Sequence, residues 1–181
     1  ELGGGGMGVV LLARQPRLRR LVAIKMIRAE MLASAKMRER FHREARALAR
    51  VAHPGICPVY DFGEWQGYLY IVMALVAGGT LKDRMAGQLP VEAVVRIIGQ
   101  VADGLAYAHG QGIFHRDVKP SNIMLDTAGR VFVMDFGLAR PRGSGELTTA
   151  GAIVGTPQYM SPEQIDGRPL TPRSDVYSLG L

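Results

Sequence analysis

The stretch Ile113-Phe-His-Arg-Asp-Val-Lys-Pro-Ser-Asn122 is the most informative part of this 181-residue chain. Thirteen residues after Asn122 comes a second charged motif, Asp135-Phe-Gly137. The side chains of Asp117, Lys119, Asn122 and Asp135 can accept a proton, neutralise an anion or bind a hard cation. Each motif alone is short enough to occur by chance, so its weight depends on the motifs that accompany it.

Further motifs stand before and after these two in a fixed order. Upstream, residues 2–10 (Leu-Gly-Gly-Gly-Gly-Met-Gly-Val-Val) fit the pattern G-x-G-x-x-G-x-V, and residues 22–25 are Val-Ala-Ile-Lys. Downstream come Gly155-Thr156 and Ser161-Pro162-Glu163. A dinucleotide-binding fold would need a strand before the glycines and a helix after them. Here a strand-like aliphatic segment follows the glycines, which argues against that alternative.

These signatures, in this order, resemble those of the protein kinase superfamily, and the resemblance covers the whole chain. Residues 155–164 (Gly-Thr-Pro-Gln-Tyr-Met-Ser-Pro-Glu-Gln) resemble the bacterial, Hanks-type serine/threonine protein kinases in particular. The resemblance implies an α+β, bilobal protein-kinase-like fold in one kinase domain. Residues 1–75 would form a nucleotide-binding N-lobe of antiparallel sheet plus one helix, residues 76–79 a hinge, and residues 80–181 a mainly helical, partial C-lobe with the catalytic and activation loops.

Local patterns agree with this division of the chain. Aliphatic and β-branched runs predict strands over residues 9–13, 21–27, 56–62 and 68–75. Apolar residues at intervals of three and four predict helices over residues 37–52 and 90–110, with a short helix over 80–87 before the longer one. A short β-ribbon is expected from residues 123–125 and 131–134, around a turn at 126–129.

The resemblance implies a catalytic role for single residues. Asp117 would orient the attacking hydroxyl and take its proton, and Lys119 would contact the transferred phosphate. Lys119 is also typical of kinases whose acceptors are Ser or Thr hydroxyls of proteins. Asn122 and Asp135 would hold Mg²⁺, with Mn²⁺ as an alternative. His115 has no second metal ligand nearby, so it is expected to pack beneath the Phe of the Asp-Phe-Gly motif.

Other residues implied by the resemblance surround the ATP molecule. Lys25 would hold the α- and β-phosphates, and Glu44 would hold Lys25. Gly3, Gly5 and Gly8 would let the backbone approach the phosphates. The positions that match those around adenine are Leu2, Val10, Ala23 and Met124, with Met73 gating the pocket behind the nucleotide and Ala74 and Val76 offering backbone groups to the adenine edge. Each apolar position also fits an ordinary core residue.

A regulatory role is implied for Arg116, which in the family meets a phosphate on the loop between the Asp-Phe-Gly and Ser-Pro-Glu motifs. Thr148 or Thr149 would carry that phosphate, and the sequence leaves both open. Arg40 is a second candidate cation for it. Thr156, beside a proline in the substrate loop, is expected to hydrogen-bond the catalytic residues rather than to be modified.

Composition restricts the setting in which such an enzyme would work. Cys57 is the single cysteine, so no internal disulfide is expected and a reducing compartment, the cytoplasm, is favoured. The apolar run of residues 68–77 is about half the length of a membrane-spanning helix, so no membrane segment is expected in this chain, although a longer parent could be membrane-anchored. The net charge is +6, but the arginines are not interleaved with aromatic residues, and nucleic acid is not an expected partner.

The expected function is a serine/threonine protein kinase that transfers the γ-phosphate of Mg-ATP to proteins, with a kinase dimer as the arrangement for trans-autophosphorylation. One alternative is a pseudokinase-type nucleotide-binding scaffold, which would be marked by loss of Lys25, Asp117 or Asp135, and all three are present. Another is a truncated, inactive product. The family's C-lobe continues for several helices beyond the position of Leu181, so the resemblance implies a truncated catalytic domain in which Glu163 lacks its usual arginine partner.

Overall fold

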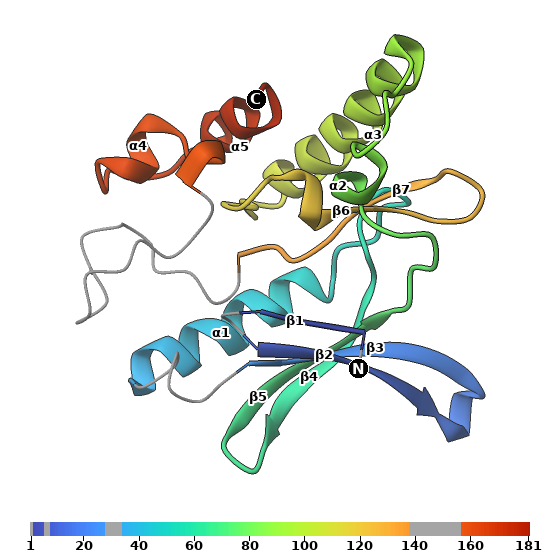
Figure 1. The fold of residues 1–181 in the computed structure, drawn as a ribbon. Coiled ribbons are helices and arrows are strands. Elements are labelled where there is room, and N and C mark those ends of the chain that lie inside the picture. Colours follow the sequence, from blue (N-terminus) through green and yellow to red (C-terminus); the bar gives the residue numbers. More distant parts are fainter. Residues whose placement is uncertain (1, 6–7, 28–33, 138–156) are drawn as a thin grey trace. The chain divides into compact units, whose positions relative to one another are not determined.

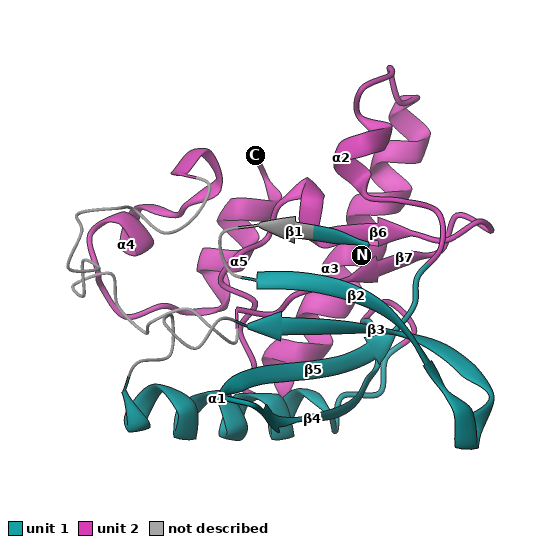
Figure 2. Cartoon of the chain, turned by 60° about the horizontal axis from the view of Figure 1, so that its bottom comes forward, with its two compact units in different colours: residues 1–53, 57–76 teal, residues 54–56, 77–181 magenta. Residues whose placement is uncertain are grey.

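The computed structural model describes residues 2–5, 8–27, 34–137 and 157–181 of the chain. The chain divides into two compact units, residues 1–53 with 57–76 and residues 54–56 with 77–181 (Figure 2). Each unit is described separately below. Within the described residues, no helix has both the length and the apolar character that crossing a membrane requires.

The first unit is built on an antiparallel sheet of five strands, in the order β1-β2-β3-β5-β4 (Figure 1). The strands are β1 (Gly3–Gly5), β2 (Gly8–Gln15), β3 (Arg20–Ile27), β4 (Val59–Trp65) and β5 (Tyr68–Ala74). A 3-10 turn, η1 (Pro16–Leu18), joins β2 to β3. Side chains of β5 alternate between buried and less buried positions, with Leu69, Ile71 and Met73 in the core. This period of two is what places one side of the strand against the interior.

Both ends of β4 differ from the sequence-based expectation. The turn between β4 and β5 consists of Gln66 and Gly67, both with positive φ (48° and 81°), which suits the twist of a tight hairpin and lets β4 extend to Trp65, three residues further than predicted. At its other end β4 begins at Val59 rather than at Ile56. Ile56 instead forms a bridge with Val133 and belongs to the second unit.

Helix α1 (Ala35–Leu48) completes the first unit. Ser34 caps it by accepting a hydrogen bond from the Met37 backbone N–H at 3.2 Å, as a serine at this position commonly does. Phe41, Ala45 and Leu48 are buried, which agrees with the predicted apolar spacing. The helix ends at Leu48, four residues earlier than predicted, because the chain leaves it through tighter turns such as Val51 N–H to Leu48 C=O.

The second unit is mainly helical. Its helices are α2 (Leu81–Arg84), α3 (Val91–Gly110), α4 (Pro162–Ile165) and α5 (Pro172–Leu179), and its two-stranded ribbon is formed by β6 (Ile123–Leu125) and β7 (Val131–Val133). Two 3-10 turns, η3 (Pro120–Asn122) and η4 (Pro157–Tyr159), lie between these elements. The core face of α3 contains Ile97, Val101, Leu105 and Ala108, whereas Val94, one turn before Ile97, is 41% exposed.

The division between the units falls between Val76 and Ala77, inside the segment 76–79 expected to act as a hinge. Gly78, just beyond it, has φ +139°, and a Cβ atom there would lie 2.3 Å from the carbonyl oxygen of Leu125. Only glycine fits this conformation and this close approach to the end of β6. The structure therefore explains the glycine, while a hinge motion in this segment stays a prediction.

Candidate active site

Asp117 lies at the centre of a compact polar cluster in the second unit. Its Oδ2 atom is 3.0 Å from the Nζ atom of Lys119 and 3.0 Å from the Nδ2 atom of Asn122. The same Asn122 nitrogen donates to the Asp117 backbone carbonyl at 2.8 Å. The tight turn η3, which begins with Pro120, brings Asn122 back towards Asp117. The structure therefore brings these three predicted site residues together, while their catalytic roles stay a prediction.

The donor pattern of this cluster limits what each group can do. Both hydrogen bonds of the Asn122 amide nitrogen go to Asp117, so its carbonyl oxygen Oδ1 is the atom that can serve a cation. Carboxylate and amide oxygens are the ligands that Mg²⁺ prefers. Asn122 and Asp135 thus fit a divalent metal chemically, and the ammonium group of Lys119 beside Asp117 fits a phosphate.

Hydrogen bonds on both sides fix the segment that carries Asp135. Before it, the Met134 N–H donates to the Asn122 carbonyl at 2.8 Å, and after it the Gly137 N–H donates to the His115 carbonyl at 2.8 Å. Asp135 itself has φ +54°, an uncommon conformation for a residue with a side chain. The surrounding hydrogen bonds stabilise this conformation. The backbone of residues 115–122, which supplies both acceptors, thereby sets the position of Asp135.

His115 is fully buried beneath this segment. Its Nε2 atom lies 2.7 Å from the Met134 carbonyl, and its Nδ1 atom accepts from the Asp117 N–H at 3.2 Å. Its ring centroid is 4.6 Å from that of Phe136, which confirms the predicted packing. Burial lowers the pKa of His115, against the opposing effects of Asp175 and of the Met134 hydrogen bond. A neutral imidazole whose two nitrogens are both engaged positions the backbone rather than transferring protons.

Asp175, in α5, accepts three hydrogen bonds from groups far away in the sequence. Its Oδ1 atom takes one from the Arg116 N–H at 2.7 Å, and its Oδ2 atom takes one from the His115 N–H at 2.8 Å. The same Oδ2 atom is 2.8 Å from Nε2 of His109. Burial by itself raises the pKa of the Asp175 carboxyl, but the hydrogen bonds from His109 and from the backbone N–H groups of His115 and Arg116 outweigh it and lower that pKa. Sequence reasoning missed this role.

Arg116 is buried, with 6% of its surface exposed and φ +66°. Its N–H group is fixed by Asp175, and its carbonyl accepts from the Gln164 side chain at 2.8 Å. The residues expected to meet it, Thr148 and Thr149, lie outside the described residues, and so does Thr156. The regulatory role of Arg116 therefore stays a prediction.

In the first unit, the sheet register places four of the predicted nucleotide-binding residues on one face. Val10 is opposite Lys25 in the β2–β3 pair, and Ala23 is opposite Met73 in the β3–β5 pair. Opposed residues of an antiparallel pair share a face, and Ala23 and Lys25 are two residues apart on the same strand. Val10, Ala23, Lys25 and Met73 therefore face the same way, as a common binding surface requires.

The glycine-rich segment precedes this face. Gly3 and Gly5, in β1, are opposite Val10 and Gly8 of β2, while the N–H group of the exposed Leu2 donates to the Val10 carbonyl at 2.8 Å. Gly8 has φ +149°, and a Cβ atom there would be 1.8 Å from the Met26 carbonyl oxygen. Gly8 is thus required by the contact of β2 with β3, in addition to its predicted place near phosphate.

Contacts of Glu44, Ala74 and Met124, and the position of Val76, complete the description of the predicted nucleotide-binding residues. Glu44 accepts from the Nε atom of Arg40 at 3.2 Å, one turn earlier in α1, and its ion pair with Lys25 stays a prediction. The Ala74 N–H donates to the Pro58 carbonyl at 3.0 Å and the Ala74 carbonyl accepts from the Cys57 thiol at 3.6 Å, so its contact with an adenine edge stays a prediction. Met124 lies in β6 of the second unit and forms an isolated bridge with Thr80. Val76 is the last residue of the first unit.

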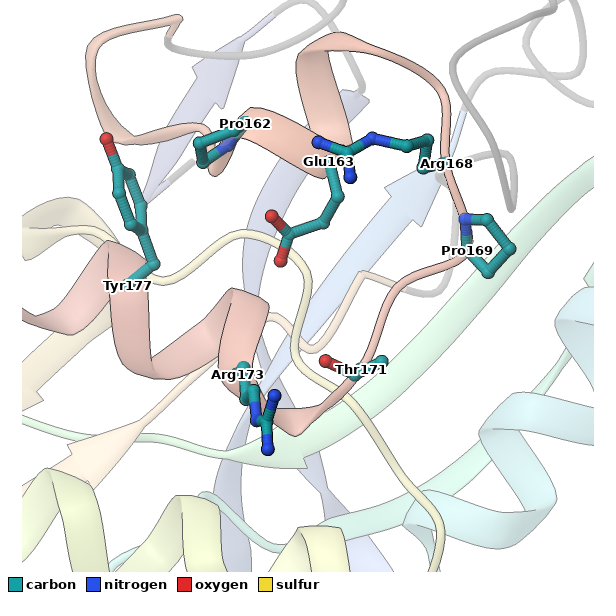
Figure 3. Close-up of a pocket in the computed structure, with 7 residues that line it drawn as sticks. All are labelled: Pro162, Glu163, Arg168, Pro169, Thr171, Arg173 and Tyr177. Carbon is teal, nitrogen blue, oxygen red and sulfur yellow. The ribbon is translucent and has the colours of Figure 1, made fainter.

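Glu163 lines a pocket of about 390 Å³ with residues of α4, α5 and the segment between them (Figure 3). The Ser174 hydroxyl donates to its carboxylate, and this hydrogen bond is the main cause that lowers the pKa of Glu163. Arg168, whose guanidinium pairs with Asp166 at 2.8 Å, adds a smaller electrostatic contribution in the same direction. The Glu163 backbone carbonyl also accepts from the Arg168 N–H at 2.9 Å.

Comparison with known proteins gives a consistent answer. The family model described as "Protein kinase domain" matches residues 1–181. The chain is 43% identical to the serine/threonine-protein kinase PknJ of Mycobacterium tuberculosis, over 99% of this chain and 31% of PknJ. It is 46% identical to the serine/threonine-protein kinase PknB of Mycobacterium leprae, over 99% of this chain and 30% of PknB. The crystal structure of the Mycobacterium tuberculosis PknI kinase domain superposes with a TM-score of 0.83 at 36% identity, covering 99% of this chain and 68% of that one.

The chain thus belongs to the protein kinase domain family, in its bacterial, Hanks-type serine/threonine branch. Its fold is that of a kinase domain, with the antiparallel sheet and α1 in one unit and most helices in the other. Members of this family use ATP and a divalent metal ion and act on protein substrates. The chain spans about a third of the length of the curated relatives that it matches.

Proposed function

We propose that this chain supplies the catalytic residues of a serine/threonine protein kinase, which transfers the γ-phosphate of ATP to Ser or Thr hydroxyls of proteins. The observation that supports this most strongly is the convergence of Lys119 and Asn122 on Oδ2 of Asp117, at 3.0 Å each. A pseudokinase scaffold would have no need for an acceptor carboxylate beside a phosphate-binding ammonium group. The names of the relatives support the same assignment.

In this proposal Asp117 orients the acceptor hydroxyl and takes up its proton, while Lys119 neutralises charge on the transferred phosphoryl group. Asn122 Oδ1 and the Asp135 carboxylate would hold Mg²⁺, or Mn²⁺ in its place, and the bound metal would neutralise charge on the nucleotide phosphates. Lys25 would bind phosphate oxygens beside the glycine-rich segment of residues 3–8. Val10 and Ala23 would contact adenine, and Met73 on the same face would gate the pocket behind it.

We also propose a domain organisation, a cellular compartment and a route of activation for this kinase. Residues 1–75 would serve as N-lobe, 76–79 as hinge and 80–181 as the partial C-lobe, with Thr156 contacting the catalytic residues from the substrate loop. Use of ATP and the presence of a single cysteine, Cys57, which can form no internal disulfide, favour a reaction in the cytoplasm. Phosphorylation of one copy by another, in a transient dimer, would start activation.

The assignment is tested by incubating the protein with radiolabelled ATP, Mg²⁺ and a generic protein substrate, followed by phosphoamino-acid analysis. We expect label in phosphoserine and phosphothreonine and none in phosphotyrosine. Labelled tyrosine would contradict the role given to Lys119. Nucleotide binding without any transfer would favour the scaffold instead.

A second prediction concerns activation. Thr148→Ala combined with Thr149→Ala is expected to lower the activity of the autophosphorylated enzyme, because Arg116 would lose the phosphate that orders its loop. The charge-assisted hydrogen bonds at stake are few, so we expect a loss of roughly 10- to 100-fold. Mass spectrometry of the active protein should find phosphate on one of the two threonines. A double variant with full activity would rule out this switch.

A further inference from the structure

The net charge of the chain comes from one short segment. Residues 2–29 contain no Asp or Glu, and their basic residues are Arg14, Arg17, Arg19, Arg20, Lys25 and Arg28. Of the 22 basic residues in the chain, removing these six leaves 16, which equals the number of acidic residues. Outside this segment the chain is therefore electrically balanced, and the excess of +6 belongs to the segment alone.

Most of that charge is on the hairpin of β2 and β3. These strands pair along their full length, up to Gln15 opposite Arg20. The neighbouring strands stop earlier: β1 pairs with β2 only as far as Val10, and β5 pairs with β3 only from Val22 onward. Residues 11–21 thus form a two-stranded ribbon, closed by η1, that extends beyond the rest of the sheet of the first unit (Figure 1).

The exposed side chains of this ribbon are of two kinds. Arg14, Arg17 and Arg19 are exposed, and so are the apolar residues Leu12, Leu18 and Leu21, with exposed fractions of 48%, 59% and 53%. Arg14 is opposite Leu21 in the β2–β3 pair, and Leu12 is two residues before Arg14, so these three share a face. At the tip, Leu18 stands between Arg17 and Arg19. Apolar and cationic groups therefore alternate over one projecting surface.

Arg20 holds the ribbon in shape and does not belong to that surface. Its Nε atom donates to Oε1 of Gln15 at 2.8 Å, and its guanidinium carbon lies 3.5 Å from the ring centroid of Tyr60 in β4. At the tip, Arg19 has φ +49° and its N–H donates to the Pro16 carbonyl at 3.1 Å. The tip is therefore preorganised by its backbone and by Arg20, independently of the side chains of Arg14, Arg17 and Arg19.

We propose that this ribbon is a docking surface for a membrane with anionic phospholipid headgroups. The exposed arginines would bind the headgroup phosphates, and Leu18, with Leu12 or Leu21, would enter the boundary between headgroups and acyl chains. Among residues 2–27 there is no aromatic side chain on which a nucleic-acid base could stack. A projecting tip also suits a planar, deformable surface better than an extended peptide, which binds in a groove with side-chain pockets.

The first test measures binding of the purified protein, as its natural chain, to sedimenting vesicles of phosphatidylcholine with or without phosphatidylglycerol. We expect binding only to the vesicles with phosphatidylglycerol. Each basic residue near an anionic leaflet contributes about a five-fold factor in affinity, so the triple variant Arg14→Gln, Arg17→Gln, Arg19→Asn should bind on the order of 100-fold more weakly. Asparagine is used at position 19 because it tolerates positive φ.

A matched control removes the same charge from elsewhere in the first unit. Arg43, Arg46 and Arg50 are exposed, and Gln at all three positions changes the net charge by the same amount as the ribbon variant. We expect this control to bind anionic vesicles almost as well as the natural protein. Equal weakening in both triple variants would show that only net charge matters, and unchanged binding by the ribbon variant would also overturn the proposal. None of the six positions belongs to the catalytic or nucleotide-binding residues, so kinase activity serves as a test of folding.

The second test detects insertion of the tip. Trp65 is the single tryptophan, so Leu18→Trp in a Trp65→Phe background places the fluorophore at the tip alone. Its emission should shift to shorter wavelength with anionic vesicles, and Leu18→Ser in the natural background should weaken binding at high salt, where the charge contribution is screened. Absence of both effects would overturn the apolar part of the proposal. Ribbon-dependent binding of single-stranded nucleic acid, of polyglutamate or of a second copy of the chain, without vesicle binding, would assign the surface to that partner instead.

Discussion

Replacement of Asp117 by Asn is expected to lower the rate of phosphoryl transfer by roughly 10²- to 10⁴-fold, the usual contribution of a positioned general base. The substitution keeps the size of the side chain but removes its ability to take up a proton. It also places an amide NH₂ or a neutral oxygen where Lys119 Nζ and Asn122 Nδ2 now donate to a carboxylate at 3.0 Å. The loss should appear in kcat, because Asp117 is proposed to act mainly in the transition state.

Two measurements separate this role from a structural one. The affinity for ATP, measured by titration of the Asp117→Asn variant, should remain close to that of the natural protein. Asp103→Asn is a matched control, since Asp103 is an exposed carboxylate on α3 of the same unit, and it should leave kcat unchanged. Transfer at the natural rate by Asp117→Asn would refute the assignment of the catalytic residue.

The parts of the site that could be predicted from the sequence are those formed by neighbours in the chain. Asp117, Lys119 and Asn122 lie within six residues of one another, and the turn beginning at Pro120 brings their side chains together. The β6–β7 ribbon was predicted almost to the residue, because β-branched runs flank a turn in which Asp126 accepts from the Ala128 and Arg130 N–H groups at 2.9 Å. Resemblance to a kinase motif identified the first group of residues, and local turn chemistry predicted the second.

Contacts between distant residues could not be predicted in the same way. The hydrogen bonds from His115 and Arg116 to Asp175 join residues separated by 60 and 59 positions, and nothing local in either segment announces them. The start of β4 at Val59 is a second case. Ile56, which was expected to open this strand, bridges to Val133 and belongs with it to the second unit. Arg40 and Glu44 form a local ion pair one turn apart on α1, whereas the pair of Glu44 with Lys25, residues 19 positions apart, stays a prediction from resemblance.

Replacement of Asp175 by Ala is expected to reduce the free energy of unfolding by about 3–5 kcal/mol, because it leaves buried donors without their acceptor. Asp175 is 2% exposed and serves the N–H groups of His115 and Arg116 as well as the ring of His109. A loss of that size is a large share of the roughly 5–15 kcal/mol that stabilises a domain. Denaturant unfolding measures it, and kcat should fall too, since His115 and Arg116 position the backbone of Asp117.

The contribution of Asp175 should depend on pH with a definite sign. Its pKa in the folded protein is lower than the ordinary value of 3.8, so the ionised form stabilises the fold above that pH, and this stabilisation is lost as the pH falls through the folded-state pKa. The stability difference between the natural protein and Asp175→Ala should therefore be constant near neutrality and shrink below about pH 4. Asp166→Ala is the control, because Asp166 pairs with Arg168 at an exposed site and should cost only about 0–1 kcal/mol. A difference between the natural protein and Asp175→Ala that persists unchanged into acid would show that packing, rather than the buried carboxylate, accounts for the effect.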